Sequence, residues 1–159
     1  MKLGGRSDSK HPKPDILQYA LHLISRAEQF SAGLLLKLQK KGYSRADAEA
    51  VIGELSVTGM LDDARYARLW LGLRIKHRSA SPRELLSAIC GKGLKRDIAS
   101  AALKEALDEC GDTAGSHELA LLRRFIAKNG LGELTAANLR KRLRFEGFSP
   151  EVLDCLADE

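Results

Sequence analysis

The chain has 159 residues, a formal net charge of +5, a hydrophobic content of 44% and an aromatic content of only 5%. No stretch free of Asp, Glu, Lys and Arg is longer than residues 16–25, which excludes a membrane span, and the three cysteines lack the close spacing of a zinc site or disulfide framework. Leu, Ala and Ile dominate the apolar residues, so the composition predicts an all-α protein. The isolated cysteines are most simply free thiols in a reducing cytosol, so we expect a cytoplasmic protein, and one that needs no cofactor or metal.

Residues 1–14 are polar and basic, and they lack the apolar stretch of a secretory signal. We expect a disordered arm there. The first helix is expected over 15–29, and similar helices over 62–76 and 116–128, because their apolar residues recur at helical spacing. Each of these helices precedes a pair of shorter ones.

Three segments resemble one another, and each predicts a helix, a tight turn and a second helix. Each begins with a residue suited to cap a helix: Ser31, Ser81 and Thr135. Each then contains a glycine where the first helix ends in a left-handed conformation: Gly42, Gly93 and Gly147. The capping signal is most complete at Ser81, since Pro82 follows at the first helical position and Glu84 can close a capping box.

Together these helices predict a tandem array of three three-helix repeats that resemble helix-turn-helix units. The first repeat is expected over 15–58, the second over 59–111 and the third over 112–159. Stacked units contact mainly their neighbours, so we expect an elongated monomer that can curve.

The stretch GMLDDARYARLWLGLR, residues 59–74, places two carboxylates beside arginines, a tyrosine and the chain's single tryptophan. Adjacent residues on a helix point about 100° apart, so Asp62 and Asp63 cannot readily face each other across a substrate. Asp62 is instead suited to cap the following helix, and Asp63 to interact with its dipole. The sequence also lacks a phosphate-binding glycine loop, an HExxH pair and a GxSxG elbow. We therefore predict a binding protein without catalytic residues, rather than an enzyme.

Charge alternates in sign along the repeats. Residues 74–96 carry seven basic and one acidic side chain, and residues 119–150 carry seven and two, whereas residues 97–118 carry one and six. Stacking in register would align the basic middle helices as a stripe, which suits a phosphate backbone or the acidic groove of a large assembly. The alternative is that these charges only solvate the outer faces of amphipathic helices. Because the pattern recurs in each repeat, we favour the stripe.

The helix-turn-helix pairs also raise the alternative of sequence-specific DNA reading. The second helix of each pair would be the recognition helix, and here it is acidic, as in ADAEAVIGEL at residues 46–55. An acidic helix is poorly suited to the major groove. Non-specific contact with a nucleic-acid backbone is therefore the better expectation.

From about Ile16 to its C-terminus the sequence resembles the RecX family, the regulators of the RecA recombinase. The resemblance is carried by the pattern G-x-L-D-D-x-R-Y-A followed by Trp and Arg, here at residues 59–74, and by the turns Lys41-Gly42-Tyr43 and Lys92-Gly93-Leu94. The chain departs from the family pattern at three places, where it has Ser81-Pro82 for Gly-Pro, Ala88-Ile89 for Glu-Leu and Glu146-Gly147 for Lys-Gly.

The resemblance implies three tandem three-helix units that bind the RecA filament on single-stranded DNA, with double-stranded DNA as a further candidate partner. Such proteins are thought to lie in the groove of the filament and to limit its growth, ATPase, strand-exchange and co-protease activities. The alternative function is that of a stand-alone nucleic-acid-binding helical protein without sequence preference.

The candidate contacts to RecA or DNA are basic residues of the signature helix and of the basic segments. They are Arg65, Arg68, Arg74, Lys76, Arg78, Arg83, Lys92, Lys95, Arg96, Arg140, Lys141, Arg142 and Arg144. We expect Arg65, Arg68 and Arg74 to project outward. Tyr66 and Trp70 are expected to pack between units, because an apolar helix stripe usually faces inward, and base stacking is the alternative for Trp70.

Overall fold

A computed structural model describes residues 15–108 and 117–156. Their regular structure is helical throughout, which confirms the all-α prediction. In chain order the elements are α1 (Ile16–Arg26), α2 (Ser31–Lys41), α3 (Arg45–Val57), α4 (Asp63–His77), α5 (Pro82–Cys90), α6 (Arg96–Asp108), α7 (His117–Asn129), the 3-10 helix η2 (Leu131–Glu133), α8 (Ala136–Phe145) and α9 (Pro150–Asp154). The expected arm over 1–14 and the repeat boundary at 111–112 lie outside the described residues.

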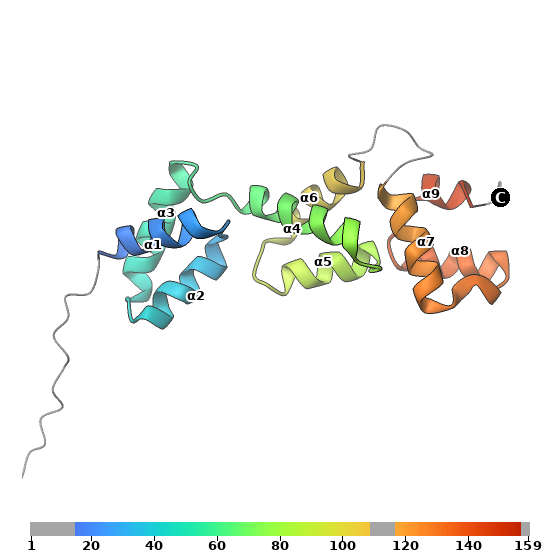
Figure 1. The fold of residues 1–159 in the computed structure, drawn as a ribbon, viewed down its shortest axis with the longest axis horizontal. Helices are drawn as coiled ribbons and strands as arrows, with labels where there is room; N and C mark the ends of the chain where they lie inside the picture. The colour runs from blue at the N-terminus through green and yellow to red at the C-terminus, as the bar shows by residue number, and fades with distance from the viewer. Residues whose placement is uncertain (1–14, 109–116, 157–159) are drawn as a thin grey trace, which may run out of the picture.

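The helices lie in an elongated row, with α1–α3 at the amino-terminal end, α4–α6 in the middle and α7–α9 at the carboxyl-terminal end (Figure 1). In the first group α2 packs on α3, and in the middle group α4 and α5 both pack on α6. Helices α4 and α6 also contact α7, so the middle and last groups are joined directly. The succession of helices follows the predicted order, while the limits of the repeats stay a prediction.

Local signals set several of the helix ends. The Ser81 hydroxyl accepts the Glu84 N–H at 3.2 Å, and the Glu84 carboxylate accepts the Ser81 N–H at 2.9 Å, so the predicted capping box closes the start of α5. Ser44 and Ser149 cap α3 and α9 through their side chains. The three aligned glycines have the positive φ angles expected of their turns, which are 98° at Gly42, 102° at Gly93 and 88° at Gly147.

Other expected helix ends differ from the prediction. Ser31 is the first residue of α2 rather than its cap, and Phe30 occupies the cap position without a side-chain hydrogen bond. Thr135 occupies the cap position of α8, but its side chain makes no capping hydrogen bond. Helix α1 ends before Gln29, whose side-chain amide donates to the Leu23 carbonyl at 3.2 Å and so satisfies an acceptor at the end of that helix.

The described hydrophobic core consists of two clusters. One joins α1–α3 and includes Leu34 and Leu38, together with Leu61 from the connection to α4. The other extends through α4–α9 and includes Leu71 and Leu122. The middle and carboxyl-terminal groups therefore share one core, whereas the amino-terminal group has its own.

Two glycine turns bring neighbouring groups into contact. A Cβ atom at Gly93, in the turn after α5, would lie 2.8 Å from the Ala32 Cβ at the start of α2. A Cβ atom at Gly147, in the turn after α8, would lie 3.5 Å from the Pro82 Cβ at the start of α5. In both cases the turn packs on the first turn of the middle helix of the preceding group, as expected of stacked units.

Replacing Gly93 by alanine is expected to lower the melting temperature more than the same change at Gly147. The two glycines have φ angles of 102° and 88°, so either alanine strains the backbone by about 1–2 kcal/mol. The alanine at Gly93 would in addition collide with Ala32, whereas the one at Gly147 would make ordinary contacts. Thermal unfolding followed by circular dichroism measures the difference. Equal losses would contradict the close packing of α2 against the turn after α5.

Candidate partner-binding surface

Helix α4 begins at the two carboxylates of the signature stretch. The Asp62 carboxylate accepts the N–H groups of Ala64 at 2.9 Å and Arg65 at 3.0 Å, and so caps its own helix as predicted. These N–H groups, that of Arg65 foremost, hold the pKa of Asp62 below its ordinary value of 3.8. The cap is therefore a carboxylate at neutral pH.

Asp63 caps a different helix. Its carboxylate accepts the Ser31 N–H at 2.7 Å, and so closes the amino-terminal end of α2, where Phe30 supplies no side-chain acceptor. A negative charge at this position also interacts favourably with the dipole of α2. The adjacent carboxylates thus serve two helices, and each has a structural role at the junction of the first two groups.

Arg65 turns toward the protein, which corrects the expectation that it projects outward. Its guanidinium pairs with Glu28 at 2.8 Å and donates to the carbonyls of Gly59 and Met60, both at 3.1 Å. These contacts join the connection before α2, the connection before α4 and the first turn of α4. Arg65 therefore stabilises the junction between the first and middle groups of helices.

The aromatic residues of α4 lie in two different environments. Tyr66 packs on Phe30 from the α1–α2 connection, with ring centroids 4.5 Å apart, and burial raises the pKa of its hydroxyl. Trp70 packs partly against the core of α4–α9, and the guanidinium carbon of Arg74 lies 3.6 Å from its ring centroid. Lys92 Nζ, from the turn after α5, lies 5.8 Å from the same centroid. Tyr66 therefore packs between groups, whereas Trp70 lies between the core and two cations.

A hollow of about 370 Å³ lies beside Trp70. Arg78, which follows α4, and Lys128 of α7 line it, and Lys128 also donates to the Ser79 carbonyl at 3.2 Å. Glu84 lines it too, but its carboxylate is engaged in the capping box of α5. We call the residues around this hollow and ring the cationic cluster, which consists of Trp70, Arg74, Arg78, Lys92 and Lys128.

The start of α5 meets the end of α8 in a buried polar contact. Ser81 Oγ donates to the Glu146 carboxylate at 2.8 Å, and the Arg83 N–H donates to the Glu146 carbonyl at 3.0 Å. Arg142 pairs with the same carboxylate at 3.0 Å. The Arg83 guanidinium lies 4.0 Å from the Phe145 ring centroid. Two of the predicted contact residues, Arg83 and Arg142, therefore both contact Glu146 at the junction of α5 and α8, Arg83 through its backbone and Arg142 through its guanidinium.

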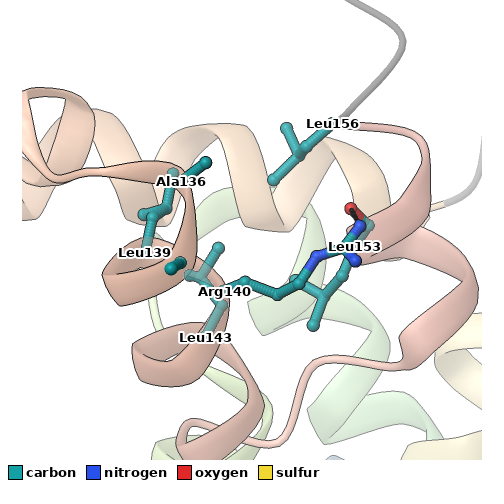
Figure 2. Close-up of a pocket in the computed structure, with 7 residues that line it drawn as sticks. Ala136, Leu139, Arg140, Leu143, Leu153 and Leu156 are labelled. Atoms are coloured by element: carbon teal, nitrogen blue, oxygen red, sulfur yellow. Dashed lines mark hydrogen bonds between the residues drawn. The ribbon is translucent and has the colours of Figure 1, made fainter.

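The other basic residues of α8 differ in their surroundings. Arg140 faces α9, where it donates to the Leu153 carbonyl at 3.2 Å and pairs with Asp154 at 2.8 Å. Figure 2 shows its side chain reaching toward α9 along the wall of an apolar hollow between α8 and α9. Lys141 and Arg144 are exposed. Arg140 therefore fastens α9 to α8, whereas Lys141 and Arg144 remain available to a partner.

Arg68 and Lys76 lie on a different face of α4 from Arg74. They line a second hollow together with Leu69 and with Glu105 of α6, and Arg68 Nη1 lies 3.6 Å from Glu105. Arg74 instead lines the hollow beside Trp70. Arg74 and Lys76, which both belong to the basic segment 74–96, therefore lie on different faces of this helix.

Lys128 belongs to the cationic cluster but is absent from the contact residues predicted from the sequence. It lines the hollow beside Trp70 because α7 packs against α4, where Arg124 donates to the Ile75 carbonyl at the end of that helix. The sequence signal is a pair of cations four residues apart on α7, but nothing local indicates what they contact. Lys95 and Arg96, which are predicted contacts, are exposed at the start of α6.

Within residues 15–108 and 117–156, no helix combines the length and apolar character that a membrane span requires. Nor do these residues contain a group of three or more His, Cys, Asp or Glu side chains arranged to hold a metal ion. What the cationic cluster offers is positive charge beside an indole ring. This combination favours phosphates, carboxylates and stacked bases.

Comparison with known proteins gives a consistent result. No family model matches the chain. The chain is 33% identical over 142 residues to regulatory protein RecX of Treponema pallidum, with 88% of the chain and 82% of the relative covered. It is 34% identical over 111 residues to regulatory protein RecX of Thermus thermophilus, with 70% and 71% covered. Its fold is similar to the crystal structure of RecX from Lactobacillus salivarius, with a TM-score of 0.65, 16% identity, and 90% and 92% of the two chains covered.

Proposed function

Because the chain belongs to the RecX family of regulatory proteins, we propose that it is a negative modulator of the RecA recombinase. In this proposal it binds in the groove of the RecA filament on single-stranded DNA and limits the growth of that filament. The ATPase, strand-exchange and co-protease activities of RecA then fall, because fewer protomers are held in the active filament. In this proposal the chain acts by occupying the filament groove, without a chemical reaction of its own.

The observation that carries the proposal is the cationic cluster on the middle group of helices. Arg74 and Lys92 lie at the Trp70 ring, and Arg78 and Lys128 line the hollow beside it. Cations gathered in this way raise the local positive potential, which suits the phosphates of single-stranded DNA inside a filament groove. The partly buried indole ring holds the Arg74 guanidinium over its face, and so keeps that cation at the edge of the hollow.

The elongated row of helices supports a position along a groove (Figure 1). Its groups are fastened at both junctions, by the hydrogen bond from Ser31 to Asp63 and by the hydrogen bond from Ser81 to Glu146. Because both junctions are held by hydrogen bonds, the binding surfaces of neighbouring groups stay at a defined spacing. Such spacing is what a protein needs in order to bridge neighbouring protomers of a filament.

The test is RecA-dependent ATP hydrolysis on single-stranded DNA with increasing amounts of the chain. We expect turnover to fall as the chain approaches the concentration of filament protomers. Undiminished turnover at stoichiometric protein would reject the inhibitory role. Addition of single-stranded DNA in excess is the control, because an inhibition that merely reflected capture of free DNA would then disappear.

The alternative, a stand-alone nucleic-acid-binding protein, is favoured by the cation-covered Trp70 ring. Titration of DNA affinity against salt in the absence of RecA separates the two functions. Tight and steeply salt-dependent binding to DNA alone would favour the alternative, because releasing counterions from many phosphates gives a steep dependence. Under our proposal, binding to the RecA–DNA filament is much tighter than binding to either single- or double-stranded DNA.

A further inference from the structure

The face of α4 that carries Arg68 and Lys76 also exposes large apolar side chains. Leu69 is 53% exposed and Leu73 is 61% exposed. They border a hollow of about 360 Å³, which we call the leucine hollow. Among its lining residues are Arg68, Leu69, Gly72, Leu73, Lys76 and Glu105. Adjacent exposed leucines on a helix leave apolar surface in water, and surfaces of this kind often mark protein interaction sites.

Gly72 forms part of the floor of the leucine hollow. It lies inside α4, where glycine is less favourable than alanine because it gains backbone freedom in the unfolded chain. A Cβ atom at Gly72 would meet nothing within 4 Å, so the fold does not require a glycine at this position. The absence of a side chain keeps open the part of the hollow that Gly72 lines.

The leucine hollow is separate from the cationic cluster. Leu71 and Ile75 are buried in the core, and Trp70 and Arg74 border the hollow described above, on a different side of α4. Leu73 is rotated by about 100° from Arg74, since α-helices have 3.6 residues per turn. One helix thus presents two surfaces of different chemistry to two different directions.

We propose that the leucine hollow docks a segment of a RecA protomer that carries apolar side chains flanked by carboxylates. This inference rests on the proposed function, because it assigns the protein contact of the filament to this face. The rim carries two cations, Arg68 and Lys76, against one carboxylate, Glu105, which lies 3.6 Å from Arg68 and offsets part of its charge. Lys76 is the cation at this rim that lies farther along the helix, and the excess of positive charge favours an acidic partner. The exposed leucines call for apolar side chains, which the phosphate backbone of a nucleic acid does not supply.

The test fills the hollow without disturbing the fold. Gly72→Glu places a side chain and a negative charge inside the leucine hollow, at a position where a Cβ atom meets no neighbour. The matched control is Gly53→Glu, which adds the same group at an exposed glycine inside α3 that also has nothing within 4 Å of its Cβ position. Gly72→Ala is the second control, since it restores helix propensity and leaves most of the hollow open.

Affinity for RecA filaments on single-stranded DNA is measured by co-sedimentation, and affinity for the same DNA alone by fluorescence anisotropy. We expect Gly72→Glu to weaken filament binding at least tenfold and to leave binding to DNA alone unchanged. Both controls should behave as the unmodified chain does. Thermal unfolding of Gly72→Glu should match that of Gly72→Ala.

Three outcomes would overturn the inference. Filament binding by Gly72→Glu equal to that of the unmodified chain would show that RecA does not use this face. An equal loss of binding to DNA alone would assign the face to nucleic acid. Self-association of the unmodified chain that disappears in Gly72→Glu, seen by sedimentation velocity, would assign it to a second copy. If the unmodified chain itself fails to bind filaments, the proposed function falls and this inference falls with it.

Discussion

Truncation of Leu122 to alanine is expected to lower the free energy of unfolding by about 2–5 kcal/mol, because removing a buried leucine loses transfer free energy and leaves a cavity. Leu122 is fully buried on α7, in the cluster that extends through α4–α9. A single domain is typically stable by only about 5–15 kcal/mol. The loss is therefore a large fraction of the stability of this core.

Which helices lose protection from amide exchange after Leu122→Ala tests whether the middle and last groups share one core. After Leu122→Ala, we expect faster amide hydrogen exchange in α4–α6 as well as in α7–α9. Leu38→Ala removes an equally buried leucine from the separate cluster of α1–α3, so faster exchange should then be confined mainly to that group. Hydrogen exchange followed by mass spectrometry distinguishes the two patterns.

The control for both substitutions is Leu36→Ala. Leu36 lies on α2, two residues before Leu38, but its side chain is 64% exposed. Its truncation should therefore change the free energy of unfolding by no more than about 0.5 kcal/mol. If Leu122→Ala leaves exchange in α4–α6 unchanged, the middle and last groups unfold independently and the shared core makes no cooperative unit.

The features of the fold that could be predicted from the sequence are the local ones. The capping box of Ser81 and Glu84 involves residues three positions apart, and it lies where the sequence predicts it. The glycine turns need only a few residues to close, and their left-handed conformations are also as predicted. Helix propensity, capping and turn chemistry act over these short distances, so the features that they determine can be predicted from the sequence.

The partners of the carboxylates could not be predicted, because they lie far apart in the sequence. Asp63 accepts a hydrogen bond from Ser31, and the Glu118 carboxylate accepts the N–H of Ser149 at 2.7 Å and its hydroxyl at 2.8 Å. Each carboxylate completes the start of a helix other than its own. A capping residue that is supplied by another helix leaves no local pattern.

Two of the residues at which the chain departs from the family pattern lie in contact with each other. The chain has Ser81 where the family pattern has glycine, and Glu146 where it has lysine. The structure places these two side chains in a buried hydrogen bond of 2.8 Å between α5 and α8. A buried carboxylate is costly without partners, and the serine hydroxyl and Arg142 supply them. The sequence alone presents these as unrelated differences.

The candidate site was predictable as a set of residue types but not as a surface. The helical period alone separates Arg68 from Arg74 by about 240°, since each residue adds about 100°, so the division of α4 into two faces follows from the sequence. The approach of Lys92 to Trp70, and the position of Lys128 in the hollow beside it, depend on how α5 and α7 pack against α4, and that packing is tertiary. The inward turns of Arg65 and Arg140 likewise depend on acceptors supplied by other elements.

The double substitution of Arg74 and Lys92 by alanine is expected to weaken binding to RecA–DNA filaments about tenfold to a hundredfold, which corresponds to about 1.4–2.8 kcal/mol. Both cations lie at the Trp70 ring, so removing them takes two charges from one small region. If both contact phosphates, the slope of log affinity for single-stranded DNA against log salt should fall in magnitude by about 1.4, since each phosphate contact contributes about 0.7. Titration of binding at several salt concentrations measures both effects.

The matched control is the double substitution of Arg68 and Lys76, which removes the same charge from the other face of α4. It should leave the affinity for DNA alone and its salt slope nearly unchanged, although it can weaken filament binding through the leucine hollow. Arg74→Lys is the second control: it keeps the charge but loses the planar group stacked on Trp70, so it should keep the salt slope and lose part of the affinity. Equal losses of DNA binding in both double variants would mean that DNA responds to the net charge of the chain, and the cationic cluster would then have no distinct role.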